Sequence, residues 1–302
     1  MSWLIFAFSG PILWALSTHL DKYLVDKYFK QSNVAVLLVF TALIGLFTLP
    51  FIWLIDPDVV GVGPANAALM ACSGVLYMGG MLLYLRALQS EEASAVAPFF
   101  QAAPLMGFGL GYLVLGEVLS PTQMAGAALI IGGTVLVSLR SDRQRTRLKL
   151  RLAALMLTAA LVLALTSLIF KIFALRQEFW PTTFWMFVGE ALFGAALLAI
   201  PSYRRQFIDL TRSNPGAVLS VNAANELINL GGSLGNRFAL TLAPLGLVQA
   251  IGSTTTLFVF GFGVLLSLFF PRLGRENLAR RELLYKGLAA VLVAAGAVLA
   301  TR

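Results

Sequence analysis

The sequence has few of the residues from which disulfides and metal centres are built. Its 302 residues include one cysteine, Cys72, and one histidine, His19. A single cysteine excludes an intrachain disulfide and a cysteine-rich metal site, and a single histidine excludes a zinc site made from a histidine cluster. The chain also lacks a GxxxxGK[ST] phosphate-binding loop, so nucleotide hydrolysis is not its expected energy source. We therefore expect no metal and no cofactor.

Charged residues are scarce as well. Only 12% of the residues are charged, 59% are hydrophobic and the mean hydropathy is +0.84, whereas about a quarter of the residues in a soluble domain are charged. Lipid is the solvent that suits such a chain, and a helix needs about 20 apolar residues to cross a bilayer. The fold class predicted is therefore an all-α integral membrane protein with ten transmembrane helices, at residues 3–20, 34–55, 64–85, 94–116, 120–139, 151–175, 182–201, 215–236, 245–270 and 283–301.

The positions of the basic residues explain the net charge of +8 without a nucleic-acid partner. Most of the 22 lysines and arginines lie in loops that join an odd-numbered span to the next even-numbered one, and only Arg176, Arg237 and Arg302 are assigned to the other side. Because lysine and arginine concentrate in cytoplasmic loops, both termini are predicted to be non-cytoplasmic in a bacterial inner membrane. The expected partners are membrane lipid and a small-molecule substrate, with the chain a monomer or a homodimer.

The two halves of the chain carry a repeated pattern. Residues 79–115 align without gaps with residues 231–267, and ALSTHLDK at 15–22 aligns with ALTSLIFK at 164–171. Each half has five spans, an odd number, so the halves insert in opposite senses, as in many secondary transporters. Helix packing alone also favours small residues at recurring positions. We predict two inverted five-helix repeats, at 1–140 and 151–302, joined by a basic cytoplasmic linker at 141–150.

Two segments carry a family resemblance. LWALSTHLDK at 13–22, and residues 102–137 with Pro104, the Gly116-Glu117 turn and a glycine-rich fifth helix, resemble EamA-like carriers of the drug/metabolite transporter superfamily. The resemblance implies a ten-helix bundle that moves small metabolites by alternating access, often outward. It also implies cytoplasmic termini, which is the opposite of what the charge bias predicts.

An unusual polar run lies in the eighth span, where residues 222–236 read NAANELINLGGSLGN. On a helix at about 100° per residue, six polar side chains fall within one arc of about 100°. They are Asn222, Asn225, Glu226, Asn229, Ser233 and Asn236. Amides that face lipid lack hydrogen-bond partners, so this stripe must face protein or a wet cavity. It either lines a substrate path or joins neighbouring helices by hydrogen bonds worth roughly 1 kcal/mol each.

Polar and aromatic residues on other spans extend the predicted substrate-binding set. With Asn222, Asn225, Glu226, Asn229 and Ser233, this set contains Trp14, Tyr77, Gln101, Gln249 and Ser253. Trp14 in the middle of the first span is explained equally well by packing or by lipid contact.

Ionisable residues within spans indicate function by default. Glu190 and Glu226 lie near the middle of the seventh and eighth spans, and because transfer out of water disfavours a charged carboxylate, each is a candidate for proton coupling. Alternatively, either carboxyl group binds a substrate amine or forms a hydrogen bond with a neighbouring helix. Lys22 and Lys171 are related by the repeat and are candidate gates near opposite surfaces, or lysines that snorkel at helix ends. The few central charges speak weakly against a strongly anionic substrate.

We therefore predict a secondary transporter that exports a small polar or amphiphilic organic metabolite by alternating access, with proton coupling. One alternative is a flippase for a lipid-linked or amphiphilic substrate, which would need a lateral opening to lipid. Another is a non-transporting membrane scaffold, which would not need the polar stripe. The chain is not expected to be an enzyme, because one histidine and one cysteine do not supply a nucleophile–base pair or a metal cluster.

Overall fold

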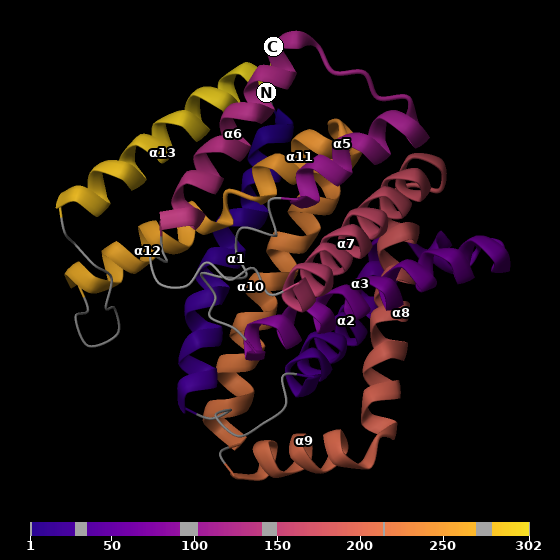
Figure 1. Ribbon diagram of the computed structural model, residues 1–302. Coiled ribbons are helices and arrows are strands. Elements are labelled where there is room, and N and C mark those ends of the chain that lie inside the picture. Colours follow the sequence, from indigo (N-terminus) through magenta and orange to yellow (C-terminus); the bar gives the residue numbers. More distant parts are fainter. Residues whose placement is uncertain are drawn as a thin grey trace.

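The computed structural model is built almost entirely of helices over its described residues, which are 2–27, 35–90, 102–140, 150–213, 215–269 and 280–301 (Figure 1). The first half holds α1 (Ser2–Lys27), α2 (Ala35–Ile55), the short 3-10 helix η1 (Pro57–Val60), α3 (Pro64–Ser90), α5 (Ala102–Leu115) and α6 (Pro121–Arg140). The second half holds α7 (Leu150–Arg176), α8 (Phe179–Ala199), α9 (Pro201–Ser213), α10 (Pro215–Leu242), α11 (Leu245–Gly252), α12 (Thr255–Phe269) and α13 (Arg280–Ala300).

Local sequence signals set the starts of several helices. Four of the described α-helices begin at a proline, namely Pro64, Pro121, Pro201 and Pro215, a position where the missing N–H has no intrahelical partner to lose. At the start of α6 the Gln123 N–H donates to Ser120 Oγ over 3.2 Å and the Ser120 N–H donates to Gln123 Oε1 over 3.0 Å. This reciprocal capping box satisfies two of the unpaired donors at that helix end.

A helix corresponds to each predicted span, with differences in extent. Six segments are long and apolar enough to cross a membrane: Trp3–Asp21, Ala35–Ile55, Pro64–Ala87, Ala154–Arg176, Phe179–Ala199 and Leu245–Phe269. Ala102–Leu115 and Gly287–Ala300 are shorter apolar helices. The helix α10 has 28 residues, but its polar side chains keep it out of the six. The chain is therefore an all-helical protein with several membrane spans, and the number ten stays a prediction.

Three details differ from the predicted spans. The eighth span continues past residue 236 to Leu242, so Arg237 lies within a helix and not in a loop. The ninth span is two helices, because Ser253 and Thr254 separate α11 from α12. The loop expected after the seventh span is the helix α9, which crosses one end of the bundle between α8 and α10 (Figure 1).

The helices pack in a limited set of pairs. The helix α1 packs on α10 and α12, α3 on α7 and α8, α2 on α8, α5 on α7 and α11, and α6 on α13. At the contact of α3 with α8, an added Cβ at Gly74 would overlap the carbonyl of Met186, and one at Gly189 would overlap the carbonyl of Ala71. Glycine at both positions allows the two backbones to touch, as is common between membrane helices.

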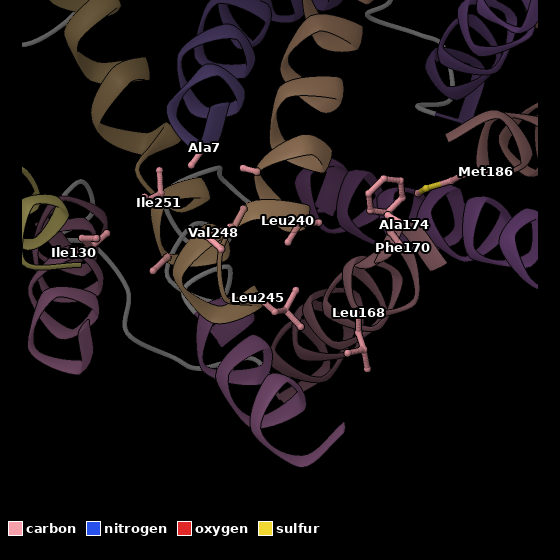
Figure 2. Packing of buried hydrophobic residues seen from close by; sticks show 13 residues of the cluster. Ala7, Ile130, Leu168, Phe170, Ala174, Met186, Leu240, Leu245, Val248 and Ile251 are labelled. Atoms are coloured by element: carbon pink, nitrogen blue, oxygen red, sulfur yellow. The ribbon is translucent and has the colours of Figure 1, made fainter. Parts of the chain in front are cut away.

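The main apolar cluster lies where α1, α7, α8, α10 and α11 meet (Figure 2). Its buried members include Ala7, Phe170, Met186, Leu240 and Val248. This cluster borders α10 at its C-terminal end, and the polar stripe of α10 ends about one turn before it. The fold therefore places a polar helix face inside an otherwise apolar bundle.

Candidate functional site

The polar stripe of α10 is buried within the bundle. Asn222, Asn225 and Glu226 are buried, with exposed fractions of 2%, 1% and 7%, and Asn229, Ser233 and Asn236 are half-buried. The helix packs on α1, α2, α7, α9 and α11, so the stripe faces protein, as its helical spacing predicted. Its side chains divide into contacts with α1 and contacts with α2, α3 and α8.

On the α1 side, one asparagine joins two polar groups. Ser17 Oγ donates to Asn225 Oδ1 over 2.7 Å, and Asn225 Nδ2 donates to Asp21 Oδ1 over 2.7 Å. Asp21 was not predicted as a site residue, because it lies at the end of the first span beside Lys22 and resembled a loop charge. The signal that could have found it is its place in the LWALSTHLDK segment.

A second carboxyl group lies next to this network. Glu226 Oε1 accepts a hydrogen bond from Thr41 of α2 over 3.1 Å. Asp21 and Glu226 are close enough to interact electrostatically. Two acidic side chains from opposite halves of the chain therefore gather where α1, α2 and α10 meet, and uncharged donors hold both of them.

Farther along α10 there is a buried ion pair. Arg237 Nη2 lies 2.6 Å from Glu190 Oε1 of α8, and the two residues are 6% and 2% exposed. Our assignment of Arg237 to a loop was therefore wrong, because the helix continues for more than a turn beyond residue 236. The weak case against an anionic substrate loses its basis, since a cation lies inside the bundle. Glu190 therefore has a cationic partner on α10 that its own sequence neighbours did not predict.

Aromatic rings surround the guanidinium group of Arg237. Its Cζ lies 4.6 Å from the ring centre of Phe187, 5.8 Å from that of Phe170 and 6.0 Å from that of Tyr77. Tyr77 also forms a side-chain hydrogen bond with Ser233 and interacts electrostatically with Glu190, Arg237 and Glu226. The predicted site residue Tyr77 therefore lies between the two charged parts of the stripe.

The candidate gate Lys171 forms the other buried ion pair among the described residues. Its Nζ lies 2.5 Å from Glu117 Oε1 and donates to the Ala243 carbonyl over 2.5 Å. Glu117 Oε2 in turn accepts from the Leu245 N–H, at the start of α11, over 2.8 Å. These contacts join α7 to the turn between α5 and α6 and to the turn between α10 and α11. Glu117 was singled out as part of the Gly116-Glu117 turn but not as a partner of Lys171.

The remaining predicted site residues are more scattered. The Trp14 ring packs on Gly10 and Gly232, between α1 and α10. Gln249 Oε1 is buried against Gly107 of α5 and has no hydrogen-bond partner among the described residues. Ser253 ends α11 and donates to the Ala250 carbonyl over 2.6 Å. Two predicted groups cannot be placed: all of Gln101, and the side chain of Lys22, lie outside the described part of the chain.

Comparisons with known proteins agree with the sequence motifs. A protein of known crystal structure superposes on the chain with a TM-score of 0.70 at 15% sequence identity, covering 99% of this chain and 96% of the other, which shows a shared fold. No curated protein matches the sequence. Residues 1–139 match the model of the EamA-like transporter family. Together with the apolar helices, this match indicates a multi-pass membrane transporter. The match over residues 1–139 confirms the resemblance to EamA-like carriers that the sequence motifs indicated.

Proposed function

We propose that the chain is a secondary transporter that moves a small polar or amphiphilic organic metabolite by alternating access, in the outward direction. The observation that carries this proposal is the buried polar face of α10. Asparagine, glutamate and arginine side chains are costly within a bilayer unless they face a polar path or each other, and they mark such paths in transport proteins. A scaffold would need no such face.

Helix packing supports an inverted repeat behind this function. Suppose that α1, α2, α3, α5 and α6 correspond to α7, α8, α10, α11–α12 and α13. Exchanging the halves then turns the α1–α10 contact into the α7–α3 contact, α1–α12 into α7–α5, and α3–α8 into α10–α2, all of which occur. The α2–α8, α5–α11 and α6–α13 contacts map onto themselves. Repeats related by a two-fold axis in the membrane plane produce this pattern.

Two further observations agree with two repeats of five spans. The family match ends at residue 139, beside the proposed boundary between the first repeat (1–140) and the linker. The two termini lie at the same end of the molecule (Figure 1), as an even number of crossings requires. We propose a bacterial inner membrane as the location, with both termini on the non-cytoplasmic side, because most of the basic residues fall in loops at the other side.

The Lys171–Glu117 pair supports a gate at one end of the path. It ties the turn before α6 to the turn before α11, and therefore joins the two proposed repeats. Opening this end requires those turns to separate, so the ion pair must break in the other state. Lys22 is the proposed counterpart at the opposite end, through its repeat relation to Lys171.

Asp21 and Glu226 support proton coupling. Coupling requires a carboxyl group that binds a proton in one state and releases it in another. Glu226 shares the stripe with the amides of the proposed substrate path and lies near Asp21, so a change in the α1–α10 contact alters the surroundings of both carboxyl groups. Glu190, the other predicted candidate for proton coupling, is paired with Arg237.

The test is counterflow in proteoliposomes with panels of amines, sugars, nucleosides, carboxylates and amphiphilic drugs, combined with thermal-shift screening. We expect at least one solute to be transported by the wild type, and the Asn229→Leu variant to lose both transport and stabilisation by that solute. Leu227→Ala, a change on the outward face of the same helix where Leu227 is 58% exposed, serves as the matched control. Movement of a lipid-linked amphiphile alone would favour the flippase, and no movement of any compound would reject transport.

A further inference from the structure

The guanidinium group of Arg237 has one edge engaged and one edge without a partner. Nη2 binds Glu190, whereas Nη1 is buried and has no hydrogen-bond partner among the described residues. A buried donor without an acceptor is unfavourable, and such groups in native proteins call for an explanation. The five N–H donors of arginine form a planar fork that matches a carboxylate on each edge.

The surroundings of Nη1 define which ligand this donor can bind. Phe187, Phe170 and Tyr77 enclose the guanidinium group, and Ser233 and Asn229 lie one and two turns earlier on the same helix. Flat rings around a cation provide an apolar wall beside a single charged donor group. This combination suits an anion attached to an apolar or aromatic body, and does not suit a small hydrated inorganic ion.

We propose that Arg237 is the receptor for the anionic group of the transported substrate, which is an organic carboxylate, and that Glu190 takes up a proton when the carboxylate binds. This inference rests on the proposed transport function and names its substrate class. In the present state Nη1 is buried, so the carboxylate reaches it when the helices around the path separate in the alternating cycle.

The proton follows from charge balance. One arginine balances one carboxylate, so a substrate carboxylate at Arg237 leaves Glu190 as a second, uncompensated negative charge inside the bundle. A carboxylate without a partner in a low-dielectric interior takes a proton from solvent in preference to remaining charged. Anion and proton therefore bind together and move in the same direction, so outward transport is driven by the gradient of the carboxylate itself and carries one proton out with each anion.

Among the described residues, no other ionisable group near Glu190 supplies a second buried cation to balance a substrate carboxylate. Glu226 of α10 and Tyr77 of α3 interact with it electrostatically, and α2 contributes no ionisable residue. Lys171 of α7 is engaged by Glu117. The other charged residues of known exposure on the elements packed on α8 are exposed, and they are Asp58, Arg86, Arg176, Arg204, Arg205, Asp209 and Arg212.

The experiment uses the purified full chain in detergent, with benzoate as the probe and benzamide as its uncharged analogue. Isothermal titration in two buffers with different protonation enthalpies gives the number of protons taken up. We expect wild type to bind benzoate with about one proton taken up per anion, and not to bind benzamide. Phenyl phosphate and benzenesulfonate test whether another organic anion replaces the carboxylate, and tighter binding of either would overturn the choice of carboxylate.

Variants separate this role from a purely structural ion pair. In Glu190→Gln, benzoate supplies the missing negative charge, so it should raise the melting temperature more than in wild type and bind without proton uptake. Arg237→Gln should weaken benzoate binding by about tenfold or more. The double variant Glu190→Gln with Arg237→Gln removes both charges and should recover stability lost in Arg237→Gln without recovering binding.

The outcomes also separate this inference from the proposed function. If Glu190→Gln is destabilised and benzoate does not restore it, or if Arg237→Gln binds benzoate as wild type does, the pair is structural and the inference is wrong. Counterflow of an uncharged solute by both wild type and Arg237→Gln would also overturn it, while the transport function would stand. If benzoate binds with proton uptake but no compound of the panel shows counterflow, the result would support the binding site and reject transport.

Discussion

Removing one charge of the Lys171–Glu117 pair should be far worse than removing both. The Lys171 side chain is 7% exposed and that of Glu117 is 17% exposed, so the pair is nearly buried. Deleting one partner of a buried ion pair costs about 3–5 kcal/mol, because the other charge remains without compensation. The residual exposure of Glu117 favours the lower limit, so we expect Glu117→Gln and Lys171→Met each to cost about 3 kcal/mol.

The double variant retains part of the local hydrogen bonding. A glutamine at position 117 has a carbonyl oxygen that can still accept from the Leu245 N–H, as Glu117 Oε2 does over 2.8 Å. Only the Ala243 carbonyl loses its donor, the Lys171 ammonium at 2.5 Å, and an unsatisfied buried acceptor costs about 1–3 kcal/mol. The double variant should therefore lose only about 2 kcal/mol, less than either single change.

The assay is equilibrium unfolding of all four proteins in the same detergent, analysed as a double-mutant cycle. Single effects that add to within about 0.5 kcal/mol in the double variant would show that the two residues do not interact, and the gate built on them would be refuted. A double variant less stable than both single variants would equally exclude the proposed pair.

The same variants test whether the pair holds one end of the protein closed. Leu245 is fully buried beside this pair, and Cys72, the only cysteine, is exposed, so Leu245→Cys in a Cys72→Ser background provides one reporter thiol. A loss of about 3 kcal/mol from the closed state shifts the population by roughly 150-fold. Glu117→Gln should therefore speed labelling of this thiol by a membrane-impermeant maleimide up to about that factor. Unchanged labelling would mean that the contact does not control access.

Two further changes test the helix contacts. Gly74→Ala should lower the free energy of unfolding by about 2–3 kcal/mol, since its methyl group would overlap the backbone of α8. Gly79→Ala on the same helix, where an added methyl meets no atom within 4 Å, should be neutral or stabilising by up to about 1 kcal/mol; similar losses for both would contradict the close α3–α8 contact. Asn225→Leu should cost about 3 kcal/mol and abolish transport, because Asp21 loses the Asn225 amide donor and Ser17 loses its acceptor. Leu227→Ala should stay within about 0.5 kcal/mol of wild type, and equal effects in the two variants would show that the buried face has no special role.

Periodicity was sufficient to predict the polar face of α10. A helix that carries asparagines and a glutamate on one side must turn that side towards protein, whichever neighbours the fold supplies, and Asn225 and Glu226 are indeed buried. Hydropathy also predicted a helix for each of the ten spans, although it missed α9. These properties depend on residues close in sequence, which is why they can be predicted before the structure is known.

The partners of the buried charges could not be predicted in the same way. Asp21 meets Asn225, Glu190 meets Arg237 and Lys171 meets Glu117, and each contact joins helices that are far apart in sequence. Arg237 was misplaced because a span of about 20 residues was ended at 236, although no proline follows until Pro244. On the helical wheel Arg237 falls about 20° from Glu226, so extending the helix would have added it to the stripe.

The charges along α10 make its two ends chemically different. At one end, Glu226 and Asp21 supply two carboxyl groups, and no cation is paired with Glu226 among the described side chains. Arg237 provides a cation that Glu190 balances on one edge only. Eleven residues separate Glu226 from Arg237, or about 16 Å along the helix axis, so a small solute cannot contact both backbone positions at once.

Communication between the two ends must therefore pass through the side chains between them. Tyr77 fits that position, because it bonds to Ser233 and interacts electrostatically with Glu226, Glu190 and Arg237. A phenol both donates and accepts a hydrogen bond, so it can respond to a change of charge at either end. On this basis Tyr77→Phe should leave benzoate binding at Arg237 intact and weaken only its dependence on the state of Glu226. Benzoate titrations of Tyr77→Phe with and without Glu226→Gln measure that dependence, and an undiminished effect of Glu226→Gln in the phenylalanine variant would exclude Tyr77 as the link.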